Sequence, residues 1–387
     1  MKTIINVDIY SGLSFIPNQV FIPYKFEVYE HQPPNFYNED KQKDNPDFKI
    51  DIIELAYSTA RTLCSYHVTD KELYFDIISS LLSHFNIVER NKKDYFVINE
   101  SRYQRLRDFS RTTRIGELAQ AINALFVSKR LKFPFIIDFD LAKEKTKSTL
   151  NLQTKGKTPD FVVLNSNLTQ IGLFESKGSA GQEPRITAKN GYLYKALKQI
   201  EDITSPLCIH NHIPSCVRFE NNKNVTKAIN KNQIKNSTIH YSLIKTECLN
   251  INESSILFNL HYASWFYLIG DFQRVDNILE DKLIDNILEE NDNFYELDTT
   301  TDEKHPIFWV KERFRSNFIS SYGEINTYLT ITSRYFRDGE LKIGIYKQVI
   351  DKLINFEKTK LNYPTVNTES LKRFPDGTLI QIKETKE

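Results

Sequence analysis

The chain has 387 residues, 40% of them hydrophobic and 26% charged, which is enough for two or three domains with real cores. Its 51 Lys and Arg against 50 Asp and Glu give a net charge of +1, so a global basic field is excluded and any nucleic-acid-binding surface must be local. Four scattered cysteines do not make a disulfide framework, and no apolar run approaches the roughly 18 residues of a membrane span. We therefore expect a cytoplasmic protein with no membrane attachment.

Residues 1–98 are expected to form an α+β module of their own. Strand-like pieces near the start are followed by an exposed loop that contains prolines, and then by helical patterns at about residues 50–66 and 71–85. The next stretch, NIVERNKKDYFVI, is typical of a hairpin with a charged tip. This order is compatible with a winged-helix DNA-binding unit, and equally with another small α+β domain.

An arginine-rich segment, SRYQRLRDFSRTTR, comes next. Its arginines are Arg102, Arg105, Arg107, Arg111 and Arg114. Because the guanidinium group offers a rigid fork to phosphate oxygens, the segment is a candidate for nucleic-acid contact. The alternative is a solvated connector.

A helix is predicted over about residues 114–133, where apolar residues recur at helical spacing. Glu117 lies off that apolar stripe, in line with small residues, so it is either solvated or directed across a close-packed face toward the strands that follow. Residues 132–141 read as a strand. The basic loop after it carries Lys155 and Lys157, which we also count as candidate nucleic-acid contacts.

The most informative stretch is TPDFVVLNSNLTQIGLFESKG, residues 158–178, which predicts two antiparallel strands at 161–165 and 169–177. With the turn centred between residues 167 and 168, Asp160 lies opposite Glu175. Side chains alternate along a strand, so Glu175 and Lys177 point to one face and Ser176 to the other. Two facing carboxylates destabilise a sheet unless a cation or an unusual protonation state offsets them. The pattern therefore indicates a bound divalent metal.

Beyond this hairpin, a helix is expected within ITAKNGYLYKALKQIEDI, with Gln199 near its end, and strand-like pieces follow up to about residue 250. From residue 254 the chain reads as mainly helical and aromatic, and it closes with a hairpin pattern in RFPDGTLIQIKE. This organisation predicts a core domain at residues 99–253 and a C-terminal region at 254–387.

The order of these features resembles the PD-(D/E)xK nuclease superfamily over about residues 113–205. A helix with Glu117 is followed by a strand, by Pro159-Asp160, by Glu175-Ser176-Lys177, and by a helix with Gln199. The resemblance implies a restriction-endonuclease-like α/β core, a mixed central sheet flanked by helices, with an N-terminal α+β and a C-terminal mainly helical addition.

The resemblance also implies roles for individual residues. Asp160, Glu175 and the backbone carbonyl of Ser176 would bind Mg2+ or Mn2+, because phosphodiester hydrolysis needs a hard cation that offsets charge and supplies hydroxide near neutral pH. Lys177 would orient or help deprotonate the attacking water. Glu117 matches an acidic metal or second-layer ligand on the first helix. Gln199 is similar to a Gln that some subgroups carry on the later helix, but there a Tyr usually follows the Gln, whereas Tyr192 and Tyr194 precede Gln199 here.

Two other sequence patterns could also indicate a metal site. Pro375-Asp376, followed by Glu384-Thr385-Lys386, has the same letters, but Pro-Asp-Gly is a turn signal and no helix follows. The other pattern is a set of zinc-competent residues, Cys208, His210, His212 and Cys216. We interpret this set as incidental, because so short a segment cannot easily wrap a tetrahedral ion; zinc is the alternative.

The expected function is that of a Mg2+-dependent endonuclease acting on DNA, with RNA as an alternative substrate, in restriction, phage defence or mobile-element processing. A helicase, ATPase or methyltransferase is a possible partner, and double-strand cleavage would favour a homodimer. The alternative function is an inactive nucleic-acid-binding or scaffold subunit with a nuclease-like fold.

Overall fold

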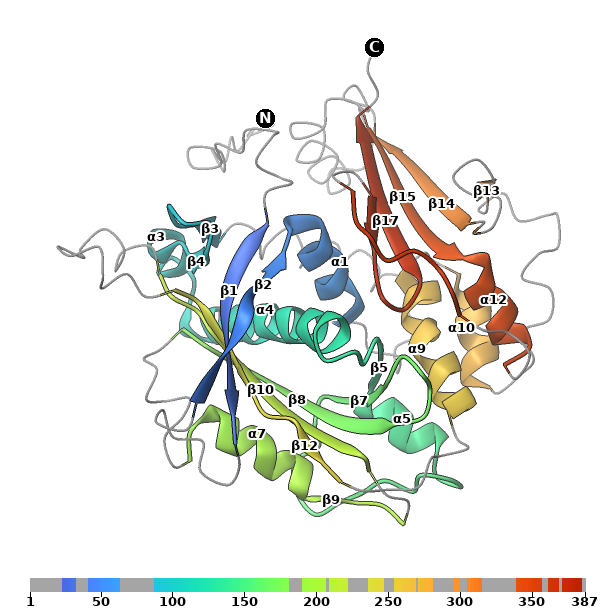
Figure 1. Cartoon of the computed structure of the whole chain (residues 1–387), viewed down its shortest axis with the longest axis horizontal. Helices are drawn as coiled ribbons and strands as arrows, with labels where there is room; N and C mark the ends of the chain where they lie inside the picture. The colour runs from blue at the N-terminus through green and yellow to red at the C-terminus, as the bar shows by residue number, and fades with distance from the viewer. Residues whose placement is uncertain are drawn as a thin grey trace, which may run out of the picture.

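The computed structural model (Figure 1) describes most of the chain between residues 23 and 384. The described ranges are 23–32, 41–62, 87–180, 190–206, 209–221, 236–246, 254–268, 271–280, 296–298, 305, 307–314, 339–356, 361–368 and 371–384.

A mixed eight-stranded sheet forms the centre of the fold. Its path runs β2 (Lys41–Ile50), β1 (Tyr24–His31), β11 (Thr238–Tyr241), β10 (Asn211–Arg218), β8 (Ile171–Ser179), β7 (Phe161–Leu164), β5 (Phe135–Asp138), with β12 (Ile244–Lys245) paired to β10. The β1–β11 and β8–β10 pairs are parallel, and the other pairs are antiparallel. The predicted mixed α/β class is confirmed at this level.

Two helices cover opposite faces of β8 and β10 (Figure 1): α4 (Asp108–Lys129) and α7 (Tyr192–Glu201). Neighbouring residues of β10 show the two sides. The Ser215 hydroxyl donates to Asn123 Oδ1 of α4 over 2.7 Å, whereas Cys216 packs with Leu193 and Leu197 of α7. Side chains on β8 that share a face with Cys216 therefore point toward α7.

The close approach of α4 to β8 depends on Gly178. A Cβ atom at this position would lie 2.6 Å from the Ile115 carbonyl oxygen and 2.7 Å from the Ala119 Cβ, distances that packed atoms do not adopt. Gly178 directly follows Lys177, so the glycine sets the distance between α4 and the strand that carries the candidate site.

The N-terminal residues are part of the central sheet rather than a separate layer. Strands β1 and β2 extend it beyond β11, so the expected boundary near residue 98 does not separate two sheets. Helix α1 (Ile52–Thr62) and the hairpin β3 (Val88–Arg90)–β4 (Phe96–Ile98) confirm one helix and the hairpin predicted here. The other predicted helix, at 71–85, lies outside the described residues, and a short helix, α3 (Glu100–Tyr103), precedes α4.

The C-terminal region corrects an expectation. Helices α9 (Ser254–Leu268) and α10 (Phe272–Leu279) form as predicted, but a five-stranded antiparallel sheet follows them, so the described part of the region is not mainly helical. Its order is β13 (Glu296–Asp298), β14 (Ile307–Phe314), β15 (Gly339–Tyr346), β17 (Thr378–Glu384), β16 (Leu371–Arg373), with α12 (Lys347–Ile354) after β15. Residues 307–314, IFWVKERF, are rich in the aromatic and branched residues that favour strands.

The remaining elements are short: α5 (Phe139–Lys145) follows β5, and β6 (Gln153–Thr154) pairs with β9 (Ile203–Thr204). One hydrophobic cluster runs from Tyr24 in β1 to Ile380 in β17, so the two sheets share a core. Within the described residues, no helix combines the length and the apolar character needed to cross a membrane.

Candidate functional site

The predicted hairpin register is confirmed. In the β7–β8 ladder Phe161 pairs with Phe174 and Val163 with Gly172, and the Asn165 amide donates to the Gln170 carbonyl over 3.0 Å. Asp160 precedes β7 by one residue, so continuing this register places it opposite Glu175.

Two hydrogen bonds between backbone and side chain join Asp160 to the neighbouring strand residues Glu175 and Ser176. The Asp160 amide donates to Glu175 Oε2 over 2.8 Å, and the Ser176 amide donates to Asp160 Oδ2 over 2.8 Å. Each carboxylate is thus fixed by the backbone of the other strand. This arrangement holds the two acidic groups side by side at the end of the hairpin.

Both carboxylates carry a raised pKa. Glu175 has no exposed surface, and burial, followed by the nearby Asp160 charge, raises its pKa to about 8. Burial also raises the pKa of Asp160, with a further contribution from Asp138. Raised values are expected where like charges are brought together out of water. The pair therefore keeps a proton more readily than free carboxylates do, unless added positive charge offsets the two negative groups.

Lys177 provides part of that charge. Its ammonium group forms an ion pair with Glu175 Oε1, and a quarter of its side chain stays exposed. Lys177 pairs in register with Cys216 of the parallel strand β10, on the face that α7 covers. Asp160, Glu175 and Lys177 are therefore brought together on one side of the sheet, as the sequence predicts.

Gln199 of α7 contacts the loop that leads into the site. Its Nε2 donates to the Thr158 carbonyl over 2.9 Å, two residues before Asp160. Gln199 therefore positions the backbone that leads to Asp160. Its side chain forms no hydrogen bond with the carboxylate of Asp160 or Glu175.

Ser176 points the other way, toward α4, and there it meets a residue that the sequence reasoning missed. Asn123, fully buried in α4, donates from Nδ2 to the Ser176 hydroxyl over 2.8 Å and lies 3.5 Å from the Lys177 carbonyl. Its Oδ1 accepts from Ser215 over 2.7 Å. The available signal was an amide residue inside the otherwise apolar run AINALFV of this helix.

Glu117 is not brought to the pair. It lies on α4, which covers the other face of the sheet, and it pairs with Arg114 over 3.4 Å. Among the residues that the structure describes, no three His, Cys, Asp or Glu side chains are grouped so that they could hold a metal ion. The expected third carboxylate ligand is therefore missing from this arrangement, because α4 and the two carboxylates are separated by the sheet itself.

The two carboxylates nevertheless fit a hard cation. Mg2+ commonly binds through one or two carboxylates and takes its other oxygens from water and from substrate phosphates. Asp160 and Glu175 supply two such donors in a setting with too little positive charge. Asp160 and Glu175 are the described residues that could hold Mg2+ or Mn2+, with the Ser176 carbonyl as a further oxygen.

The arginine-rich segment divides into two groups. The first group is paired on α4: Arg111 forms an ion pair with Asp108 and donates to Gln104 over 2.7 Å, and Arg114 pairs with Glu117. Both guanidinium groups already have an acidic partner, so Arg111 and Arg114 are weaker candidates for phosphate contact than the sequence suggested.

The second group is more open. Arg102 is half-buried and already has an interaction partner, but Arg105 and Arg107 are exposed and form no ion pair within the described residues. Lys155 and Lys157 are also exposed, and Lys157 lies three residues before Asp160. Exposed cations of this kind are available for phosphate.

The zinc-competent set does not assemble among the described residues. His210 Nδ1 accepts the Ile171 amide over 3.3 Å, and Cys216 is a buried free thiol in β10. Burial lowers the pKa of His212. Cys208 lies outside the described residues.

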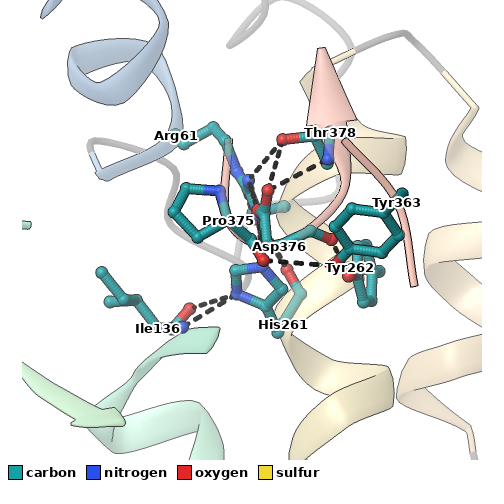
Figure 2. Close-up of polar contacts among 9 residues, drawn as sticks. Arg61, Ile136, His261, Tyr262, Tyr363, Pro375, Asp376 and Thr378 are labelled. Carbon is teal, nitrogen blue, oxygen red and sulfur yellow. Dashed lines mark hydrogen bonds and ion pairs between the residues drawn. The ribbon is translucent and has the colours of Figure 1, made fainter. Parts of the chain in front are cut away.

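A second polar cluster surrounds Asp376, in the Pro-Asp-Gly turn between β16 and β17 (Figure 2). Arg61 of α1 forms an ion pair with the Asp376 carboxylate, and His261 Nε2 of α9 lies 2.9 Å from it. Thr378 donates its amide to the same carboxylate over 3.1 Å. The charges of this buried cluster satisfy one another, so it joins the C-terminal sheet to the helices instead of resembling a second catalytic site.

Comparison of the chain with protein-family models, with curated proteins and with solved structures finds no match.

Proposed function

We propose that the protein is a metal-dependent nuclease of the PD-(D/E)xK type that hydrolyses phosphodiester bonds in DNA. The order of elements supports this proposal: helix α4, three antiparallel strands β5, β7 and β8, helix α7, and strand β10 parallel to β8. It is the order that the resemblance of the sequence implies for a restriction-endonuclease-like core.

The observation that carries the proposal is the grouping of Asp160, Glu175 and Lys177. Asp160 directly precedes β7, Glu175 and Lys177 lie in β8, and the three meet at one end of a buried hairpin. Burying two like charges destabilises the fold, because both groups lose their hydration and repel each other. Groups held at such a cost with raised pKa values are candidates for a functional site.

The chemistry follows from the groups present. Held by Asp160 and Glu175, Mg2+ or Mn2+ would offset the negative charge that develops on the scissile phosphate. Lys177 places an ammonium group beside the same carboxylates, where it can contact the phosphate and orient the attacking water. Gln199 and Asn123 keep the two strand ends in place from opposite faces of the sheet.

The role in the cell is a proposal of the same kind. Restriction, phage defence and mobile-element processing are the settings in which nucleases of this type occur, and a helicase, ATPase or methyltransferase could direct the enzyme. A chain with one such site would cut both strands of a duplex most simply as a homodimer.

The test is cleavage by the wild type and by Lys177→Ala of linear, supercoiled and single-stranded DNA and of RNA, each in Mg2+, Mn2+ or EDTA. Lys147→Ala, a change of another exposed lysine, is the matched control. We expect cleavage of DNA that requires metal, survives in the control and is lost in Lys177→Ala. Metal-independent cleavage, or equal rates in all three proteins, would refute the assignment. Nucleic-acid binding with no cleavage of any substrate would favour the inactive scaffold instead.

A further inference from the structure

An aromatic ring stands out in solvent at the start of α4. Phe109 is 82% exposed, and the other exposed large hydrophobic side chains among the described residues are Val366 at 77% and Ile354 at 44%. Of these three, only Phe109 is aromatic. Single exposed apolar residues are common on protein surfaces, so the residues around the ring decide whether it has a function.

The helix surface beyond Phe109 is unusually bare. Residues three and seven positions further on lie on the same face of a helix; here they are Thr112 and Gly116, and both are exposed. A Cβ atom at Gly116 would meet nothing within 4 Å, so packing does not require glycine there. Glycine inside a helix costs about 1 kcal/mol relative to alanine. Its use at an unpacked position is consistent with the close approach of another molecule to the backbone.

Two exposed cations stand just before this helix in the chain. Arg105 and Arg107 precede Phe109, are exposed, and form no ion pair within the described residues. The acidic group nearest in sequence, Asp108, is engaged by Arg111. We call Phe109, Thr112 and Gly116, together with Arg105 and Arg107 just before the helix, the outer α4 face.

We infer that the outer α4 face binds an unpaired stretch of the DNA substrate, with Phe109 stacked on a base and Arg105 and Arg107 on phosphates. The identity of the ligand as DNA rests on the proposed function. Alternating cations and aromatic rings are how proteins hold single strands, because a base offers its π-face to a side chain only when it is not stacked within a duplex.

The position of this face relative to the candidate site can be estimated along α4. Asn123 lies level with Ser176, and Ile115 lies against Gly178, so α4 runs antiparallel to β8. Phe109 is 14 positions before Asn123, which is about 21 Å along the helix axis at about 1.5 Å per residue. The outer α4 face, which also lies across the sheet from the carboxylate pair, would therefore hold the strand at a distance from the scissile bond.

The test is equilibrium binding in EDTA, where cleavage does not occur, of a labelled oligothymidine of about twenty nucleotides and of a blunt duplex of the same length. The proteins are the wild type, Phe109→Ala, Phe109→Trp and Gly116→Ala. Phe109→Ala should weaken single-strand binding by about 5- to 100-fold, the range for loss of one base–aromatic stack, and duplex binding by less than about twofold. Phe109→Trp should bind the single strand as tightly as the wild type.

Gly116→Ala separates binding from folding. The added methyl group meets no atom of the protein and favours the helix, so this variant should unfold at a higher temperature while it binds the single strand more weakly. Three results would overturn the inference: no single-strand binding by the wild type, unchanged binding by Phe109→Ala, or an equal loss for single strand and duplex. If Phe109→Ala loses single-strand binding but the wild type cuts no substrate with metal, the nuclease proposal is wrong and the binding face stands. If the wild type cuts DNA and Phe109→Ala binds normally, the reverse holds.

Discussion

Asn123 on α4 and Ser176 on β8 are joined by a hydrogen bond of 2.8 Å across the interface between helix and sheet. Ser176 lies between Glu175 and Lys177, so the bond fixes the strand end that carries both of these candidate side chains. Asn123 also accepts from Ser215 on β10, and it thereby ties two parallel strands to one helix. A fully buried amide in this place restrains the geometry of the candidate site from behind.

Replacing Asn123 with alanine should therefore slow cleavage as well as weaken the fold. The Ser176 and Ser215 hydroxyls would lose a buried partner, which should lower the free energy of unfolding by roughly 2–4 kcal/mol. A shift of the strand end should reduce the single-turnover cleavage rate by about 10- to 100-fold at a temperature where the variant is folded. Gln120→Ala is the control, because Gln120 also lies on α4 but contacts the Thr62 carbonyl. Wild-type cleavage by folded Asn123→Ala would show that this restraint is not needed.

Glu175 should make the metal-free protein less stable as the pH rises. Its pKa is raised from the ordinary 4.5 to about 8, so between these values the folded state binds more protons than the unfolded state. The free energy of unfolding should then fall with increasing pH, by at most about 1.4 kcal/mol per unit, and level off above pH 8. Denaturant titrations from pH 5 to 9 in EDTA measure this slope.

Glu175→Gln is the matched control for this pH dependence of stability, and added Mg2+ tests whether the same residue binds metal. Glu175→Gln cannot titrate, so the contribution of this residue to the slope should disappear. Mg2+ should raise the melting temperature of the wild type at pH 8, because it supplies the missing positive charge, but not that of Glu175→Gln. Equal slopes in both proteins would mean that Glu175 is already ionised in the folded state.

The sequence predicted the hairpin register well because its constraints are local. Strand alternation and the turn position together determine which residues face each other, and the predicted register is the one observed in the β7–β8 ladder. The parallel pairing of β1 with β11 joins residues about two hundred positions apart, and no local pattern encodes it. The side of the sheet that α4 covers depends on the same kind of long-range packing. For that reason Glu117 matched a motif but lies away from Asp160 and Glu175.

The prediction of a mainly helical C-terminal region was wrong for a different reason. Aromatic and apolar residues are dense both in α9, which is buried nearly all round, and in the following strands, so composition alone does not separate helix from strand there. Arg61 and His261, which contact Asp376, could not be assigned to it from the sequence because they lie 315 and 115 positions away.

Asp376→Asn should destabilise the protein without removing a group of the candidate site. The change leaves Arg61 buried without its anionic partner, which typically costs about 3–5 kcal/mol. Arg61 and hydrogen bonds hold the pKa of Asp376 well below its ordinary value, so its contribution to stability is present above pH 4 and is lost as the pH falls further. Chemical unfolding should show a large difference between wild type and variant at pH 7 and a smaller difference at pH 3, where the unfolded state already gains a proton but folded Asp376 still resists it. An equal difference at both pH values would contradict the role of the ionised pair.

Arg105→Ala together with Arg107→Ala should weaken DNA binding and make it less sensitive to salt. Both side chains are exposed and without an ion pair among the described residues, so their removal should not disturb the fold. The slope of log K against log salt should become shallower by about 1 for each phosphate contact that is lost. Lys147→Ala controls for the loss of a positive charge elsewhere. An unchanged slope in the double variant would identify the arginines as part of a solvated connector.

Glu117→Ala tests the one expected ligand that the fold places away from the carboxylate pair. The variant loses a partly exposed ion pair with Arg114, worth about 0–1 kcal/mol, and no contact with Asp160 or Glu175. We therefore expect Mg2+ to stabilise Glu117→Ala as it does the wild type, and the cleavage rate to change by less than about threefold. Glu175→Gln, measured beside it, should lose both properties. If Glu117→Ala instead lost metal binding and cleavage together, α4 would have to present Glu117 to the carboxylate pair when DNA and metal are bound, and the two-carboxylate site would be incomplete.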